Sequence, residues 1–355
     1  MARPLRVGIL NDMSDEPVPG NAERWLRLAV DDLRSSGRLD RDVELVQAWG
    51  LGLPSGSAAA VERAYAELVD QDVLLIVGPA IGDDALVATP LADRFRVPTI
   101  NWAGSERARS EYMFHLQVGS HEDESIILAR HLAALGARRI GVVFDRSPIG
   151  RRHLLFLHSE AEALGMQLAG SASVAPLAED ADTEVRGVLG SAVDAVVYLG
   201  LGLSAPAVAG ALAAQGWNGP RAMNTCGLRG YDPEFGVRID GWVYVDMVSD
   251  DNATFAELRR RLELPANTGP GPAYGFDLGR LVAEGLARAP ERTRDGVKEG
   301  LEQVKWLPAA EGHDGTLLGF GHHDRGALHG RYLVLRQWAG GQSVEIGSAT
   351  SELAD

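Results

Sequence analysis

Three groups of residues have types and spacings that suit chemistry, and the first is a glycine-rich turn. Gly200-Leu201-Gly202-Leu203-Ser204-Ala205 fits the G-x-G-x-x-A pattern that brings backbone N–H groups against the pyrophosphate of a dinucleotide. That pattern also needs a carboxylate at the end of the next strand, and here the next strand ends in Asn224-Thr225-Cys226. The sequence therefore favours a tight turn that lines a ligand cleft. A dinucleotide-dependent α/β enzyme stays as an alternative.

The second group has the donor atoms for a metal site and lies near the C-terminus. Its members are His313, Asp314, His322, His323, Asp324 and His329. No two of these histidines have the i, i+4 spacing that places two imidazoles on one face of a helix. The segment also fits a hairpin with strands at Thr316–Phe320 and Gly330–Trp338. We predict that these side chains are solvated loop residues and that the protein binds no metal.

The third group consists of possible nucleophiles and paired acids. Cys226 is the only cysteine, so it cannot form an internal disulfide, and no motif ties it to a histidine. The sequence has no G-x-S-x-G elbow and no P-loop. The acidic pairs, such as Asp83-Asp84, fit the first turn of a helix, where they complement the helix dipole. We therefore predict no catalytic residues, no cofactor and no enzymatic activity.

Alternating strands and helices position these turns. An apolar strand at Val73–Val77 leads through a small-residue loop to a helix for which Asp83 or Asp84 is the predicted N-cap. A second strand, Val97–Ile100, ends in another small-residue loop that reaches Ser105. Both loops follow carboxyl ends of parallel strands, where helix N-termini and free N–H groups meet ligands in open α/β sheets. The same alternation starts again after Glu122, so we predict two doubly wound α/β lobes.

Length and charge narrow the class of protein further. A chain of 355 residues is too long for one ordinary core, which also indicates two lobes. The net charge of −15 repels phosphates, so we expect no nucleic-acid partner. No segment has the apolar length for membrane insertion. The N-terminus MARPLRVGIL shows no export signal, so we expect a cytoplasmic protein as the chain stands, and a periplasmic or extracellular one if a signal peptide was removed.

Several short motifs occur in a specific order along the whole chain. They are VGILNDMS, IVGPAIGDD, VPTINWAGS, FDRSPIGR, AYGFDLGRLVAEGL and GFGHHDRGAL. In this order they resemble the type I periplasmic binding proteins of the branched-chain amino-acid receptor group, which are substrate-binding proteins of ABC transporters. The resemblance implies two Rossmann-like lobes joined by a three-strand hinge and closing on a small ligand. It assigns residues 1–118 and 248–328 to one lobe, and 119–247 and 329–355 to the other.

The resemblance also implies where the ligand binds. The loop at Ile81-Gly82 and the hydroxyl of Ser105 would hold a ligand carboxylate, which agrees with the affinity of helix N-termini for anions. The expected ligand contacts are Asp12, Ser14, Ile81, Gly82, Trp102, Gly104, Ser105, Arg146, Leu201, Gly202, Thr225 and Cys226.

Two positions depart from the family pattern and bear on the ligand. Amino-acid receptors have a carboxylate for the ligand ammonium where this chain has Cys226, and an aromatic residue where it has Gly202. A buried ammonium without a counter-charge is costly, while Trp102 offers a flat stacking wall and Gly202 would widen the pocket. We therefore expect a carboxylate- or amide-bearing ligand without a free ammonium, such as an aromatic or hydrophobic acid or an amide. Two roles stay open: uptake through the membrane subunits of an ABC transporter, or sensing through a regulatory protein, as in amide-responsive regulators of this fold.

Overall fold

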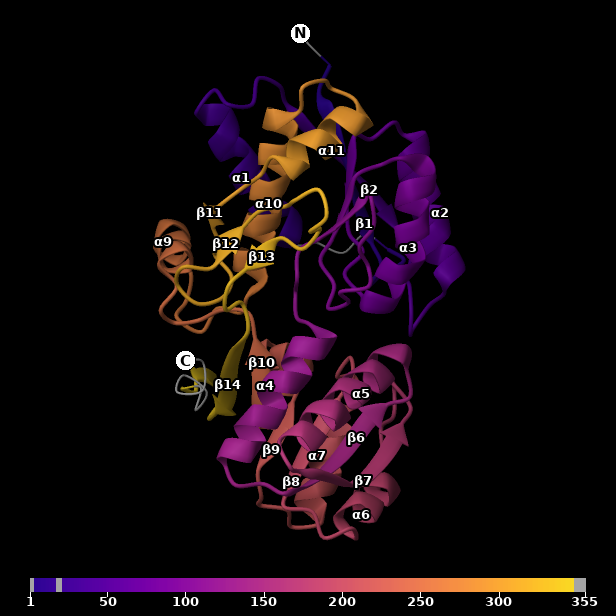
Figure 1. The fold of residues 1–355 in the computed structure, drawn as a ribbon, viewed down its shortest axis with the longest axis vertical. Coiled ribbons are helices and arrows are strands. Elements are labelled where there is room, and N and C mark those ends of the chain that lie inside the picture. The colour runs from indigo at the N-terminus through magenta and orange to yellow at the C-terminus, as the bar shows by residue number, and fades with distance from the viewer. Residues whose placement is uncertain (1–2, 17–20, 348–355) are drawn as a thin grey trace. The chain divides into compact units, whose positions relative to one another are not determined.

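The computed structural model describes residues 3–16 and 21–347, which form two α/β lobes (Figure 1). Lobe 1 comprises Met1–Ser120, Val248–Leu264 and Pro270–Tyr332, and lobe 2 comprises His121–Met247, Pro265–Gly269 and Leu333–Asp355. Each lobe is thus assembled from segments that are far apart in the sequence. Among the residues described, no helix is long and apolar enough to cross a membrane.

Lobe 1 is built on a five-stranded parallel sheet in the order β2-β1-β3-β4-β5. Its strands are β1 (Leu5–Asn11), β2 (Val43–Trp49), β3 (Leu75–Val77), β4 (Thr99–Asn101) and β5 (Met113–His115). β1 pairs with β2 on one side and with β3 on the other, and Ile9 lies opposite Val77. The residues that follow β1 therefore lie beside the loop that follows β3.

Helices cover both faces of this sheet, as Figure 1 shows for its upper part. The helices of lobe 1 are α1 (Asn21–Ser35), α2 (Ala58–Asp70), α3 (Gly82–Phe95), α9 (Ala253–Leu262), α10 (Gly271–Arg288) and α11 (Arg294–Glu302). Alternate side chains of a strand point to opposite faces. Accordingly, Leu75 and Val77 of β3 pack with α1, α10 and α11, whereas Ile76 packs with α2 and α3. Because both faces are buried, β3 is apolar throughout, as the sequence predicted.

The predicted hairpin near the C-terminus is wrong. A small sheet in lobe 1 is formed by β11 (Leu307–Pro308), β12 (Leu317–Leu318) and β13 (Leu328–His329), with β12 paired to both neighbours. The second predicted strand is β14 (Val334–Ala339), which belongs to lobe 2 and pairs there with β10 and β15. Strands of two residues leave almost no alternation to read, so the sequence pattern could not show where one sheet ends and the next begins.

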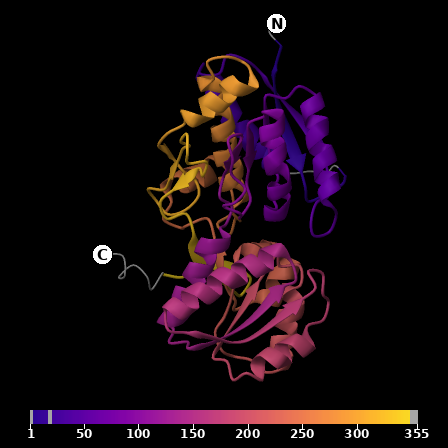
Figure 2. The same cartoon turned by 45° about the vertical axis from the view of Figure 1, so that its right-hand side comes forward.

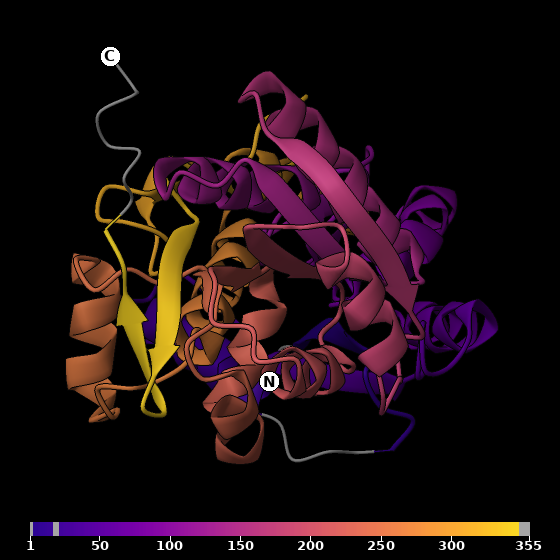
Figure 3. The same ribbon diagram turned by 90° about the horizontal axis from the view of Figure 1, so that it is seen from below.

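Lobe 2 has a seven-stranded sheet in the order β15-β14-β10-β9-β8-β6-β7. Its strands are β6 (Arg139–Asp145), β7 (Gln167–Val174), β8 (Ala195–Leu199), β9 (Arg221–Met223), β10 (Val243–Asp246), β14 (Val334–Ala339) and β15 (Gln342–Glu345). Strands β6 to β10 are parallel. The β14–β15 hairpin, yellow in Figure 3, is antiparallel and turns at Gly340-Gly341, where both residues have positive φ.

The helices of lobe 2 enclose its sheet (Figure 2). They are α4 (His121–Ala134), α5 (Pro148–Ala163), α6 (Asp182–Leu189), α7 (Ala205–Ala214), α8 (Pro233–Gly236) and the 3-10 helices η1 (Thr225–Tyr231) and η2 (Val237–Ile239). Val196 and Tyr198 of β8 face the core that contains α6 and α7. The alternation of strand and helix in both lobes confirms the predicted α/β fold.

Candidate functional site

The loop after β3 is held by a carboxylate of lobe 1 itself. Asp12 follows β1 directly and is only 2% exposed. Its Oδ1 accepts a hydrogen bond from Ala80 N at 3.0 Å, and its Oδ2 accepts one from Ile81 N at 2.8 Å. The sequence had assigned this loop to a ligand carboxylate. In the structure, the N–H group of Ile81 donates to Asp12 and is therefore not available to a ligand carboxylate.

Asp12 has a second carboxyl group beside it. Helix α3 begins at Gly82 with Ile81 as its N-cap, so the prediction that Asp83 or Asp84 caps the helix is wrong; both lie inside its first turn. Asp84 Oδ1 instead accepts a hydrogen bond from Leu53 N at 2.9 Å. Its buried Oδ2 has no hydrogen-bond partner among the described residues, and the carboxyl interacts electrostatically with Asp12. The segments that follow β1, β2 and β3 are therefore in contact with one another.

This pair shares one negative charge at neutral pH. Burial raises the pKa of both carboxyls, and that of Asp84 rises to about 8. Two backbone N–H donors on Asp12 favour its ionised form, whereas Asp84 has one such donor and also feels the charge of Asp12. The proton therefore resides on Asp84.

An aromatic cavity of about 380 Å³ lies in lobe 1 next to Asp12. Its most prominent walls are the stacked rings of Trp102 and Tyr274, whose centroids are 5.1 Å apart at an interplanar angle of 23°. The described lining residues are Ile9, Leu10, Asn11, Asp12, Met13, Ser14, Glu23, Trp25, Leu26, Trp49, Val77, Trp102, Gly271, Tyr274 and Leu278. Asp12, Ser14 and Trp102 were predicted site residues. Trp49 and Tyr274 were missed, because nothing in the sequence indicates that β2 and α10 meet there.

The two carboxylates that line this cavity already accept hydrogen bonds from the protein. Among the described lining residues there is no arginine, lysine or histidine. Of the two carboxylates, Asp12 accepts from the loop after β3, and Glu23 accepts from Arg27 at 2.9 Å and from Gln47 at 2.6 Å. The cavity therefore offers no cation to a ligand anion. Its aromatic walls suit a flat, uncharged group.

The turn after β4 is rigidly built and carries Trp102. Asn101 donates to the carbonyls of Ala108 and Phe114, both at 2.8 Å. His115 is fully buried, which lowers its pKa to about 3 and keeps the imidazole neutral. Because Arg109 donates to His115 Nδ1 at 3.0 Å, the Nε2–H group donates to the carbonyl of Ala103 at 2.5 Å. Of the other predicted contacts in this turn, Ser105 is buried and Gly104 is partly exposed.

Lobe 2 repeats the arrangement around Asp12. Asp145, the last residue of β6, is buried and accepts from Leu201 N at 2.8 Å, Tyr198 Oη at 2.6 Å and Ser204 Oγ at 2.8 Å. Burial raises its pKa, and these hydrogen bonds oppose the shift. A Cβ at Gly200 would overlap the Asp145 carboxyl. The glycine thus makes room for the protein's own carboxylate, where a dinucleotide fingerprint makes room for a pyrophosphate.

Gly202 and Cys226 are direct neighbours in lobe 2. Gly202 has φ +87°, and a Cβ on it would lie 2.8 Å from Cys226 Cβ and 3.1 Å from Arg229 Cδ. Arg229 also donates to the carbonyl of Leu201 at 2.7 Å. The space beside Gly202, predicted to be open, is therefore filled by these two side chains.

A carboxylate that the sequence analysis missed lies beside Thr225. Glu124 of α4 is 1% exposed and accepts from Thr225 N at 2.6 Å. Glu124 lies in the first turn of α4, and only the packing of α4 against this turn shows its proximity to Cys226. Burial raises the pKa of the Cys226 thiol, and the negative charges of Asp145 and Glu124 raise it further.

One amide ties the two turns of lobe 2 together. Asn224 accepts from Gly200 N at 3.2 Å and donates to Gly200 O at 3.0 Å and to His153 Nε2 at 3.2 Å. The predicted residues Leu201, Gly202, Thr225 and Cys226 thus gather at one edge of the lobe 2 sheet. Arg146 follows β6 at the same edge with an exposed side chain.

Two of the C-terminal histidines lie beside carboxylates: His322 Nδ1 is 3.0 Å from Glu302 Oε2, and His313 Nδ1 is 3.5 Å from Asp251 Oδ2. His322 and His323 are exposed, and His329 Nε2 contacts the carbonyl of Gly319 at 3.0 Å. Throughout residues 3–16 and 21–347, no three histidine, cysteine, aspartate or glutamate side chains are grouped to hold a metal ion.

Comparison with solved structures places this architecture among known binding proteins. A type 1 periplasmic binding protein from Bordetella pertussis Tohama I superposes with a TM-score of 0.81 at 16% identity, covering 97% of this chain and 100% of the other. A leucine binding protein from Thermotoga maritima MSB8 gives 0.80 at 15% identity, with 97% and 98% covered. An ABC transporter substrate-binding protein from Desulfitobacterium hafniense, in complex with leucine, gives 0.78 at 14%, with 97% and 100% covered.

Sequence comparison identifies the family. No curated protein sequence matches the chain, but the family model described as "Periplasmic binding protein" matches residues 4–336. That family and its structural relatives are receptors rather than enzymes, so the dinucleotide-dependent enzyme is set aside. The chain belongs to the type I periplasmic binding proteins.

Proposed function

We propose that this protein closes its two lobes on a small, flat, largely apolar molecule and delivers it to the membrane subunits of an ABC transporter. The ligand has an amide or a carboxylate and lacks a free ammonium. The observation that supports this most is the cavity beside Asp12, with its stacked Trp102 and Tyr274 and no basic residue among its described lining. Burying an aromatic ring against such walls provides most of the binding free energy.

The choice of an uptake role rests on the relatives. Several are ABC transporter substrate-binding proteins, and members of the family are typically exported. We therefore place the protein outside the cytoplasm. The same closure on a ligand would also serve a sensor that acts through a regulatory protein. A pull-down with the cognate membrane subunits, in the presence and absence of ligand, separates the two roles.

The expectation that the ligand has no free ammonium rests on Cys226. One of the relatives is described as a leucine binding protein, and another is described in complex with leucine. In this chain, Cys226 occupies the position where the resemblance implies the ammonium-binding carboxylate of the amino-acid receptors. Glu124 lies close by, but its carboxylate already accepts from Thr225 N at 2.6 Å. We expect Glu124 to serve mainly to hold this turn in place.

A thermal-shift panel tests the proposal on the purified protein. The panel contains leucine and valine, aromatic and aliphatic acids, the corresponding amides, and nicotinamide dinucleotides. A ligand at a hundred times its dissociation constant stabilises the folded state by about 2.7 kcal/mol, a shift of a few degrees. A shift with aromatic amides or acids supports the proposal. Saturation with leucine or valine would end it, and a shift with a dinucleotide alone would restore the enzyme alternative.

A further inference from the structure

We propose that Asp12 is a built-in substitute for a ligand anion, and that lobe 1 consequently binds its ligand through an uncharged group such as an amide. The inference rests on the proposed function and narrows it, since a carboxylate-bearing ligand is then excluded from lobe 1. It makes Asp12 the residue that determines specificity between an acid and its amide.

The geometry of the turn carries the argument. Two consecutive backbone N–H groups at the start of a helix bind a carboxylate well, because both donors and the helix dipole favour negative charge. In this protein Ala80 N and Ile81 N each donate to a different oxygen of Asp12, at 3.0 and 2.8 Å. The Asp12 side chain is 2% exposed and is fixed there by the pairing of β1 with β3. A ligand carboxylate would have to displace it.

Charge opposes a ligand anion as well. Asp12 lines the cavity, and the described lining residues include no side chain that would be positively charged at neutral pH. Two carboxylates in one partly desolvated site cannot both stay ionised without a large cost. An amide meets no such repulsion, because its NH2 group can donate to a carboxylate oxygen.

Lobe 2 supplies an independent observation of the same design. Asp145 ends the first strand of that lobe, and it accepts from Leu201 N, which belongs to the turn after the neighbouring strand β8. The pairing of a strand-end aspartate with the adjacent turn thus occurs in both lobes. In each case, a turn that the sequence assigned to the ligand is satisfied by an internal carboxylate.

Matched acid and amide probes test the inference on the wild-type protein. We would measure benzamide against benzoate, and indole-3-acetamide against indole-3-acetate, by thermal shift and calorimetry at pH 7. Since a hydrogen bond involving a charged group contributes enough to change affinity by about tenfold or more, we expect each amide to bind at least about tenfold more tightly than its acid. Equal or tighter binding of the acids overturns the inference.

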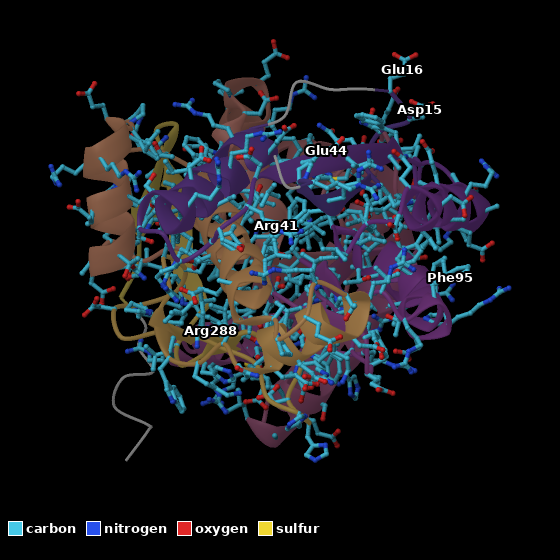
Figure 4. The ribbon with its side chains drawn as sticks, turned by 90° about the horizontal axis from the view of Figure 1, so that it is seen from above. Asp15, Glu16, Arg41, Glu44, Phe95 and Arg288 are labelled. Atoms are coloured by element: carbon cyan, nitrogen blue, oxygen red, sulfur yellow. The ribbon has the colours of Figure 1, made fainter. Side chains whose placement is uncertain are left out.

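Variants of Asp12 give a second, independent readout. Asp12→Ala releases the N–H groups of Ala80 and Ile81, so we expect it to gain benzoate binding. Asp12→Asn keeps the shape of the side chain and removes its charge, so the preference for amides should narrow. Asp15→Asn is the matched control, because Asp15 is exposed at the periphery of the lobe (Figure 4) and should leave selectivity unchanged.

The outcomes separate the inference from the function on which it rests. A folded Asp12→Ala variant that gains no benzoate binding, together with an Asp12→Asn variant of unchanged selectivity, overturns the role of Asp12. If no probe binds the wild-type protein but benzoate binds Asp12→Ala, Asp12 does exclude a ligand anion, and the proposed amide ligand of the wild-type protein is wrong. Circular dichroism of each variant shows that it is folded.

Discussion

Replacing Asp84 by asparagine should make the protein more stable at high pH and leave it unchanged near pH 4. The side chain is buried in the first turn of α3, accepts from Leu53 N at 2.9 Å, and feels the charge of Asp12. Asparagine has the same shape, keeps an oxygen acceptor for Leu53 and cannot ionise. The variant therefore imitates the protonated acid at every pH.

The sign and size of the effect follow from the pKa of Asp84. Burial raises it from 3.8 to about 8. Between these two values the folded protein holds a proton that the unfolded chain has released, so the wild-type protein loses stability as pH rises. At 1.36 kcal/mol per unit of pKa, the whole interval sets an upper limit of roughly 6 kcal/mol. Because the ionisation of Asp84 also depends on the charge of Asp12, we expect a smaller gain in the free energy of unfolding, about 1–3 kcal/mol at pH 9.

Urea unfolding, followed by tryptophan fluorescence at pH 4, 6, 8 and 9, measures this difference. The free energy of unfolding of Asp84→Asn minus that of the wild-type protein should increase from pH 4 to about pH 8 and then stay constant. Asp70→Asn serves as the control, since Asp70 is exposed at the end of α2. A difference that does not change with pH, or that falls as pH rises, would refute the assignment of the shared proton to Asp84.

Three other substitutions test the site and its supports. Ser105→Ala should weaken ligand binding by about 1 kcal/mol in calorimetry if its hydroxyl meets a polar ligand atom; unchanged affinity removes Ser105 from the site. Gly202→Ala should lower the free energy of unfolding by about 1 kcal/mol more than Gly216→Ala, as measured by chemical unfolding. Both residues have positive φ, but only Gly202 lacks space, since the added carbon would lie 2.8 Å from Cys226 Cβ. Asp277→Ala should lower the free energy of unfolding by about 3 kcal/mol in the same assay. The reason is that the buried side chain accepts from Ala310 N at 2.7 Å and from Arg280 at 3.1 Å. A loss of stability below about 1 kcal/mol would contradict this structural role.

The long elements of the fold could be predicted because their patterns are local. The alternation predicted to start again after Glu122 is present, for example as β7 (Gln167–Val174), α6 (Asp182–Leu189) and β8 (Ala195–Leu199). Each is a run of one periodicity between clear turn residues. The N-cap prediction for α3 is wrong for a physical reason. The helix begins at Gly82, before both aspartates, and Asp84 Oδ1 accepts from Leu53 N outside its own helix.

The contacts that decide ligand chemistry could not be predicted, because they join residues far apart in the sequence. Asp12 accepts from Ala80 N because β1 and β3 are neighbours in the sheet, and this strand order cannot be deduced from the sequence. Glu124 meets Thr225 across 101 positions. The same is true of Tyr274, which reaches Trp102 because α10 returns to lobe 1.

An internal carboxylate changes where the binding free energy originates. A buried N–H group without a partner costs about 1–3 kcal/mol, and a receptor that uses such groups recovers this energy when a ligand anion arrives. Here Asp12 satisfies Ala80 and Ile81 before any ligand binds, so that gain is not available. Affinity must then come from burial of apolar surface. An aromatic ligand that buries about 150 Å² gains roughly 4 kcal/mol at 25 cal/mol per Å². Calorimetry should therefore show a negative heat-capacity change and an affinity that hardly varies with salt. A strong decrease of affinity with salt would mean that a charged group of the ligand is recognised after all.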